Sequence, residues 1–316
     1  MLKTMIHDTF HIILRKGLSM KRSYVLSVLL LFVSAPVLAE GIAPPENTVI
    51  AEACRDDVYL LQLFCLGQLP HNKNIEPIKV LINHGYVVGY SEMRRNPIWT
   101  VFKASGLSSG SVFRFERSQF FSRDLRTVAQ VHGQTFGGGY DRGHMVPNFV
   151  IANQYGSLAQ METFLMSNMC PQKADLNQKS WAQLEKFVTL LAEERDHVFV
   201  FAGPIFGDDP QLVERGESRK IQIPDAFYKI IVDTDREFTI NFDTGSIPKV
   251  EIISYIFPQD TPADADFRDR EKFGASVDEI EERTGLDFFP GAEQIGGDRW
   301  KERESEKVMV HWTVLD

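Results

Sequence analysis

The clearest regular element of the chain is a helix predicted over residues 177–195, in which apolar side chains recur at helical spacing from Trp181 to Leu191. A β-rich run at residues 197–202 follows at once and ends at Gly203-Pro204. A helix joined so directly to a strand makes this a mixed fold, and the arrangement of the other elements decides its class.

Further strand-like runs lie on both sides of this helix without a regular strand–helix alternation. These runs are residues 86–90, 98–102, 111–115, 226–232 and 250–257. Residues 118–138 contain few apolar positions and lead into a glycine-rich loop, and Ser276-Val277-Asp278-Glu279 is a capping box that opens a helix ending at Gly285. We therefore predict a single α+β domain over about residues 55–290, with a final apolar run at 308–315 as an additional candidate strand.

Residues 20–39 have the pattern of a secretory signal peptide. Basic residues at 21–22 precede an apolar stretch at 24–33, and small residues at 37–39 offer a cleavage site before Glu40. The apolar stretch is short for a membrane span, and an uncleaved anchor is the alternative. We expect an exported protein, periplasmic or secreted, that has no membrane segment in its mature form, and we interpret residues 1–19 as an upstream extension.

Export would place the three cysteines in an oxidising compartment. Cys54 and Cys65 are close in sequence and are predicted to pair, whereas Cys170 is predicted to be free and buried. The other pairings stay open, because the sequence alone does not decide connectivity.

The charge of the chain argues against a protein that coats nucleic acid by bulk electrostatics, because such a protein would be basic. The net charge is −9, and since residues 1–39 hold five basic and one acidic side chain, the mature chain would carry about −13. The distribution is uneven, however. Residues 92–126 contain seven Arg and Lys against three Asp and Glu. A local basic face on an acidic body suits a hydrolase that must release its product.

The first chemical cluster is Gly139-Tyr140-Asp141-Arg142-Gly143-His144. Hydrolysis of a phosphodiester needs an activated water, neutralisation of the transition state, stabilisation of the leaving oxygen and alignment. His144 is the best candidate for a general base, because a neutral imidazole can take a proton from water. Arg117 and Arg142 are candidates to neutralise the phosphoryl oxygens, and Asp141 is expected to orient a neighbouring side chain.

The second cluster lies at the start of the predicted helix. Asn177 is the candidate Mg²⁺ ligand, because Mg²⁺ prefers oxygen and often keeps several waters; a plain helix cap is the alternative. Glu185 lies two turns further on and would orient metal-bound water, unless it belongs to a solvated helix face. Trp181, between them, is expected in the core. No serine-hydrolase elbow, Walker loop, His-Glu-x-x-His sequence or zinc-spaced Cys/His set competes with this site.

The ordered motifs resemble the DNA/RNA non-specific endonuclease family of ββα-metal nucleases, which includes secreted bacterial nucleases and mitochondrial endonuclease G. The resemblance covers roughly residues 60–290. The motifs that carry it are Arg117-x-x-x-Phe121-x-x-Asp124, Tyr140-Asp141-Arg142-Gly143-His144, residues 163–172, Leu176-Asn177-x-x-x-Trp181-x-x-x-Glu185, residues 202–206, Ile223-Pro224-x-Ala226-Phe227-Tyr228-Lys229 and residues 280–289.

The resemblance implies a central, mostly antiparallel sheet flanked by helices, with a ββα-metal motif carrying the site. It implies His144 as general base, Asn177 as the ligand of Mg²⁺ (with Mn²⁺ as the alternative), and Arg117 as the phosphate-binding arginine. Asp141, Arg142 and Glu185 would support them. Some family members carry another arginine one turn after the helix glutamate, where this chain has Thr189, so that role is not transferred.

The predicted segments are 1–39 (upstream extension plus signal peptide), 40–59 (N-terminal segment), 60–290 (endonuclease domain) and 291–316 (charged C-terminal tail). DNA and RNA are the expected substrates, and the sequence leaves open a homodimer and a protein inhibitor. Two other functions also stay open. One is a phosphodiesterase for nucleotides or other small phosphoesters, and the other is a catalytically inactive, secreted nucleic-acid-binding protein.

Overall fold

The computed structural model describes residues 48–50, 69–74, 76–106, 116–134, 136–213, 220–234 and 250–290, all within the compact unit Glu46–Asp316. The predicted signal peptide, Cys54, Cys65, the strand run at 111–115 and the run at 308–315 lie outside these residues. Cys170 is free and buried, as predicted. In the described part of the chain, no helix combines the length and the apolar character needed to cross a membrane.

An eight-stranded sheet forms the centre of the described unit. Its strand order is β1-β3-β4-β5-β8-β11-β12-β13, and only the β1–β3 pair is parallel. The strands are β1 (Thr48–Ile50), β3 (Ile78–Asn83), β4 (Tyr86–Ser91), β5 (Asn96–Ser105), β8 (His197–Ile205), β11 (Ala226–Thr234), β12 (Val250–Pro258) and β13 (Gly274–Ala275). The predicted α+β class with a mostly antiparallel sheet is confirmed.

Three short strand pairs and several helices surround this sheet. The pairs are β6 (Tyr140–His144) with β7 (Met169–Lys173), β9 (Leu212–Val213) with β10 (Ile221–Gln222), and β2 (His71–Asn72) with β14 (Leu286–Asp287). The helices are α4 (Asn148–Glu162), the 3₁₀ turn η1 (Met166–Asn168), the π-helical turn η2 (Leu176–Trp181), α5 (Ala182–Arg195), α6 (Arg270–Phe273) and α7 (Val277–Thr284).

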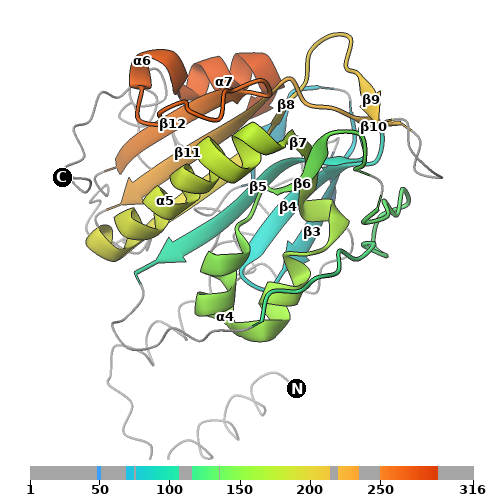
Figure 1. Ribbon diagram of the computed structural model, residues 1–316, viewed down its shortest axis with the longest axis horizontal. Helices are drawn as coiled ribbons and strands as arrows, with labels where there is room; N and C mark the ends of the chain where they lie inside the picture. Colours follow the sequence, from blue (N-terminus) through green and yellow to red (C-terminus); the bar gives the residue numbers. More distant parts are fainter. Residues whose placement is uncertain are drawn as a thin grey trace, which may run out of the picture. The chain divides into compact units, whose positions relative to one another are not determined.

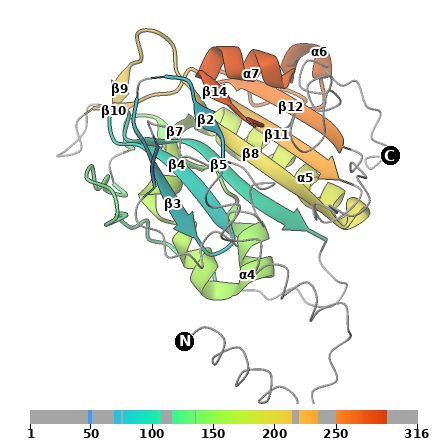
Figure 2. The same ribbon diagram turned by 180° about the vertical axis from the view of Figure 1, so that it is seen from behind.

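Both faces of the large sheet are covered, so its strands are apolar on both sides. In β4, Tyr86 and Val88 belong to the core cluster that contains the α5 side chains, whereas Val87 belongs to a second cluster that contains Val277 of α7. In Figure 1, α5 crosses in front of the strands, and in Figure 2 the strands lie in front of α5. This explains why the strands read as continuous apolar runs in the sequence.

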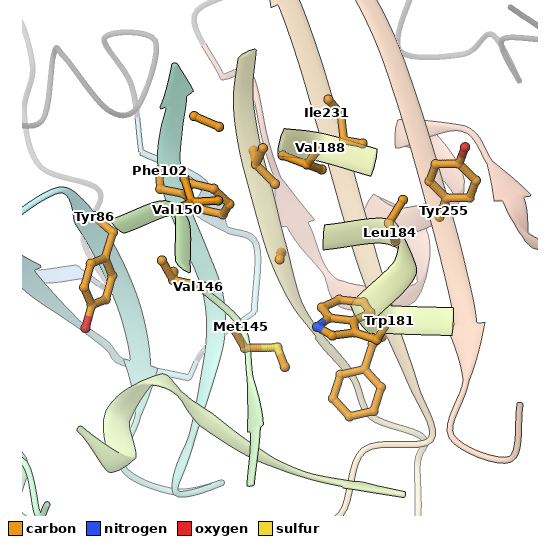
Figure 3. Packing of buried hydrophobic residues seen from close by; sticks show 14 of the residues in the cluster. Tyr86, Phe102, Met145, Val146, Val150, Trp181, Leu184, Val188, Ile231 and Tyr255 are labelled. Carbon is orange, nitrogen blue, oxygen red and sulfur yellow. The ribbon is translucent and has the colours of Figure 1, made fainter. Parts of the chain in front are cut away.

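The face of α5 that packs on the sheet is the one predicted from its spacing. Leu184 and Val188 are buried, and Figure 3 shows them directed at the strands that carry Ile231 and Tyr255. Trp181, at the start of the helix, is only 1% exposed and is therefore a core residue, as expected. The sheet thus fixes the helix whose first turns carry Asn177 and Glu185.

The helix predicted after Ser276 is confirmed together with its caps. The Ser276 side chain accepts a hydrogen bond from the Glu279 backbone N–H, and Gly285 ends the helix in a left-handed conformation (φ 69°). Helix α4 was not predicted. Its interior is interrupted by Gly156 (φ 85°), so no continuous helical period runs through its sequence.

A close approach between β4 and β5 yields a stability prediction. Gly89 lies opposite Trp99, and a Cβ atom at residue 89 would overlap the indole ring. We expect Gly89→Ala to lower the free energy of unfolding by about 1–3 kcal/mol, the usual range for overpacking. Urea denaturation would measure this, and Trp99→Phe in the Gly89→Ala background should recover part of the loss. Equal stabilities of Gly89→Ala and wild type would contradict the overlap.

Candidate active site

The candidate site is built on the β6–β7 pair and the helix that follows it. The strands are antiparallel, with His144 opposite Met169, and η2 and α5 continue the chain soon after β7. Figure 1 shows this pair next to the end of α5 that η2 joins. The order strand, strand, helix is the ββα arrangement implied by the sequence motifs.

Gly143 allows the two strands to pack closely at the site. A Cβ atom at this residue would overlap the side chain of Gln172, which is fully buried on the partner strand. Any larger residue at 143 would displace Gln172 or open the strand pair next to His144. The glycine of the motif therefore has a steric role.

The chain that follows His144 is held by Asn168. The Asn168 side chain accepts from the Val146 N–H at 3.0 Å and donates to the carbonyl oxygens of Val146 and Thr163, both at 3.0 Å. Its own backbone carbonyl accepts from Met145 N–H at 3.1 Å. Because Asn168 is completely buried, these bonds are shielded from water and fix the position of His144 from its C-terminal side.

His144 itself is 8% exposed and lies among aromatic rings. The Phe164 ring meets the imidazole edge to face at 5.2 Å, and the Phe121 ring lies 5.8 Å away, centroid to centroid. The buried Nε2 atom has no hydrogen-bond partner among the described residues. A buried polar atom without a partner is rare in folded proteins, and such atoms are common where a substrate or ion binds.

The surroundings of His144 keep its imidazole neutral. Burial, followed by the positive charges of Arg117 and Arg142, lowers the pKa of His144 from 6.5 to about 3. A neutral imidazole is the form that can accept a proton.

Two exposed arginines flank His144. The Arg142 guanidinium stacks on the Phe121 ring at 4.2 Å from Cζ to centroid and donates to the Gly133 carbonyl at 2.9 Å. The Arg117 guanidinium lies 5.8 Å from the Phe164 ring centroid. The same rings that pack on the imidazole thus also hold the two cations, and the three predicted residues His144, Arg117 and Arg142 belong to one cluster.

Asn177 is anchored to the strand pair by Asp141. Its Nδ2 atom donates to Asp141 Oδ2 at 2.9 Å, and Nε2 of the neighbouring Gln178 donates to the same oxygen at 2.8 Å. Because the amide nitrogen faces the carboxylate, the Oδ1 atom is turned away from it and is the atom that would meet a cation. Asp141 therefore orients a neighbouring side chain, as its sequence context predicted.

The alternative interpretation of Asn177 as a plain helix cap is wrong. The capping position of η2 belongs to Asp175, and no side-chain capping bond is made there. Asn177 lies inside the wide turn, with its carboxamide bound to another segment. A wide π-helical turn frequently marks a functional site, and here it replaces the ordinary helix start expected from the sequence.

Glu185 is half-buried rather than part of a solvated face, so that alternative is also wrong. Its Oε1 atom is buried and has no hydrogen-bond partner among the described residues. Burial raises the pKa of the Glu185 carboxyl, and the charges of Lys229 and Arg117 oppose this rise. The positive charge of Arg117 lowers the pKa of both Glu185 and His144. Arg117 therefore links the helix side of the site to the strand side electrostatically.

The helix and the strand are also joined directly. Trp181 donates its indole N–H to the backbone carbonyl of His144 at 3.1 Å, and both groups are buried. This bond sets how far the helix end that carries Asn177 lies from the strand that carries His144.

The residues present fit a hydrated divalent cation. The described part of the chain contains no group of three or more His, Cys, Asp and Glu side chains placed to hold a metal. Mg²⁺ does not need such a group, because it commonly keeps several of its waters. The Asn177 amide oxygen could serve as a ligand, and the unpartnered atoms Glu185 Oε1 and His144 Nε2 could accept hydrogen bonds from bound water.

Sequence reasoning gave no role to Lys229, Gln172 or Asn168, although all three lie within the motifs. Lys229 and Gln172 are fully buried, and their side-chain polar atoms lack hydrogen-bond partners in the described residues. The available signal was a lysine inside an otherwise apolar strand. Its meaning depends on which helix covers that strand, which the sequence does not state.

The depressed pKa of His144 predicts a pH dependence of stability. Below pH 6.5 the unfolded chain binds a proton at this residue and the folded chain does not, so stability is lost as the pH falls from 6.5 toward about 3. The loss is on the order of 5 kcal/mol over the whole range. We expect His144→Asn to gain stability relative to wild type as the pH is lowered. Urea unfolding in EDTA at pH 7.5, 6 and 5 would measure this, and a pH-independent difference would contradict it.

Known proteins resemble this chain over its central part. A family model described as DNA/RNA non-specific endonuclease matches residues 70–294. A nuclease of Serratia marcescens is 34% identical over 153 residues, 48% of this chain and 51% of that protein. A nuclease of Nostoc sp. is 27% identical over 217 residues, 66% of this chain and 73% of that protein. The mitochondrial endonuclease G of Bos taurus is 28% identical over 220 residues, 65% of this chain and 67% of that protein.

A solved structure of an EndoG/EndoGI complex supports the fold, with a TM-score of 0.56 and 24% identity over 73% of this chain and 91% of that chain. The match to the Serratia nuclease spans about half the length of that protein. The family model, in contrast, matches well over half of this chain. The chain therefore belongs to the DNA/RNA non-specific endonuclease family and is an endonuclease of the hydrolase class.

Proposed function

We propose that this protein is an exported, Mg²⁺-dependent endonuclease that cuts the phosphodiester bonds of DNA and RNA by attack of water. One observation carries the proposal. A neutral, unpartnered His144 Nε2 lies in the same cluster as two exposed guanidinium groups, and the strand that bears it holds the Asn177 carboxamide through Asp141. A proton acceptor, phosphate-binding cations and a ligand for a hard cation are thus combined.

Arg117 and Arg142 would bind the phosphoryl oxygens, because a guanidinium group matches their geometry and charge. Their binding of phosphate has a consequence for His144. The two cations lower the pKa of His144, so an anionic phosphate between them would offset their charge and raise it again. His144 would then become a stronger base when substrate is bound, and it would take the proton of the attacking water.

Asn177 would hold the cation, and Glu185 would accept hydrogen bonds from the waters around it. When bound, Mg²⁺ or Mn²⁺ supplies the positive charge that stabilises the phosphoryl group and the leaving oxygen. Asp141 keeps the Asn177 amide in place. The other groups would contact the phosphate, the cation or the waters around the cation. None of them is assigned to a base or a 2′-hydroxyl, which supports cleavage of both DNA and RNA.

The alternative activity on small phosphoesters is less well supported. A cavity of about 430 Å³ exists in the described part of the molecule, but its walls include Arg94, Phe206 and Glu282 and none of the candidate site residues. The guanidinium groups of the site are exposed instead. An exposed cationic site suits a polymeric substrate better than a small, enclosed one.

Export is proposed from residues 20–39 alone. The relatives include enzymes named as mitochondrial as well as bacterial nucleases, so their names do not decide the compartment. The segment boundaries at residues 39, 59 and 290 are likewise proposed from the sequence pattern alone.

A gel assay tests the activity. We expect the wild type to degrade both plasmid DNA and total RNA in Mg²⁺ and to stop when a chelator is added. His144→Ala should lower turnover by at least ~10²-fold, as expected for loss of a general base. Degradation of neither polymer by the wild type would reject the proposal, and full activity of His144→Ala would reject the assignment of the base.

The ligand role of Asn177 has its own test. Asn177→Ala should abolish Mg²⁺-dependent cleavage without a change in the circular dichroism spectrum, because it removes the proposed ligand oxygen from the surface of the site. Gln178→Ala is the matched control, since Gln178 is a second carboxamide on the same Asp141 oxygen. We expect this control to lose no more than a few-fold in rate. An unchanged Mg²⁺ requirement in Asn177→Ala would refute the ligand role.

A further inference from the structure

Lys229 is a fully buried lysine whose ammonium group has no hydrogen-bond partner among the described residues. It lies on β11, opposite Ala202 of β8 and Tyr255 of β12. Its Nζ atom lies 4.0 Å from the ring centroid of Trp181. Burial of a charged group without a hydrogen bond is costly, so the presence of a lysine at this position calls for a physical reason.

The charged and titratable groups around Lys229 identify its partner. On β12 the neighbour is Tyr255, which also packs against Arg270 at 5.2 Å, and the β8 neighbour Ala202 carries no charge. From the helix side, the group that acts on Lys229 is Glu185. Burial lowers the pKa of Lys229 to about 8, and Glu185 raises it, while Lys229 in turn opposes the effect of burial on Glu185.

The two side chains also share an unusual environment. Glu185 Oε1 and Lys229 Nζ are both buried and both without a hydrogen-bond partner in the described residues. Trp181 connects them to the rest of the site, because its ring packs against Lys229 and its N–H binds the His144 carbonyl. An anion and a cation of this kind stabilise each other through a low-dielectric interior without direct contact.

We propose that Lys229 is a positioning residue of the active site. Its ammonium group, fixed on the sheet against Trp181, keeps Glu185 ionised and directed toward the cation at Asn177. This inference rests on the proposed function, because it assigns Lys229 to the metal side of that same site.

A role in the fold and a role in the site predict different stabilities for a variant that lacks the Lys229 charge. Replacing a buried charge by an apolar side chain of similar size is often neutral or stabilising when the charge serves no structural purpose. Methionine has nearly the length of the lysine stem and adapts to irregular spaces. If Lys229 serves the site rather than the fold, Lys229→Met should therefore fold at least as stably as the wild type and should bind metal less well.

The experiment measures Mn²⁺ binding by calorimetry and the urea unfolding midpoint, both on the full chain without nucleic acid. For Lys229→Met we expect an unchanged or higher midpoint and Mn²⁺ affinity reduced by about tenfold or more. Glu185→Gln should weaken Mn²⁺ binding to a similar extent. The double variant should bind Mn²⁺ no more weakly than the single variant that has the lower affinity. Lys186→Met, which removes an exposed lysine next to Glu185 on α5, is the matched control and should bind Mn²⁺ like the wild type.

Wild-type Mn²⁺ affinity in Lys229→Met, or additive losses in the double variant, would overturn the inference. If Lys229→Met does not fold, Lys229→Gln gives the same comparison. Weak binding by a folded Lys229→Gln supports the role, normal binding rejects it, and failure of both variants to fold shows that the lysine serves the fold. A wild type that neither binds Mn²⁺ nor cuts nucleic acid would instead reject the proposed function itself.

Discussion

The hydrogen bond from the Trp181 indole to the His144 carbonyl is the contact on which the rest of the site depends. The β6–β7 pair is not part of the large sheet, so its place must be set by side chains. Trp181 packs edge-on against Phe227 and Phe257, which belong to the sheet, and reaches the strand from there. Trp181 and Gln259, whose side chain bonds the β7 backbone at Pro171 and Lys173, thus transmit the rigidity of the eight-stranded sheet to a two-stranded element that would be marginal alone.

The site combines groups whose charges are controlled by burial rather than by pairing. His144 is kept neutral, while the Glu185 Oε1 and Lys229 Nζ atoms are buried and neither atom has a hydrogen-bond partner among the described residues. The exposed arginines complete this arrangement on the solvent side. In the proposed function, a phosphate and a hydrated cation would provide the partners that these buried polar atoms lack among the described residues. The stability of the fold and the chemistry of the site therefore place different demands on the same residues.

Much of the fold could be predicted from the sequence because its strands are apolar on both faces and α7 carries its own caps. Local periodicity could not predict the β6–β7 pair, since a strand that reads Tyr-Asp-Arg-Gly-His has no apolar period, and only the resemblance of the motifs implied it. Helix α4 was hidden by the break at Gly156. The residue types of the site were visible, but the contact between Asp141 and Asn177 joins residues 36 positions apart. The position of Lys229 depends on the packing of α5 over β11, which no local pattern encodes.

The π-helical turn at Leu176–Trp181 has a consequence for how this site can vary between related chains. A π turn closes its hydrogen bonds one residue later than an α turn does. Deleting one residue there would restore a regular helix and leave the buried face of α5 on the sheet, but it would rotate everything before the deletion by roughly 100° about the helix axis. The carboxamide would then leave the strand pair while the protein stayed folded. The additional residue of the π turn is therefore not required for a regular helix, but it is required to place Asn177 at the strand pair for hydrolysis.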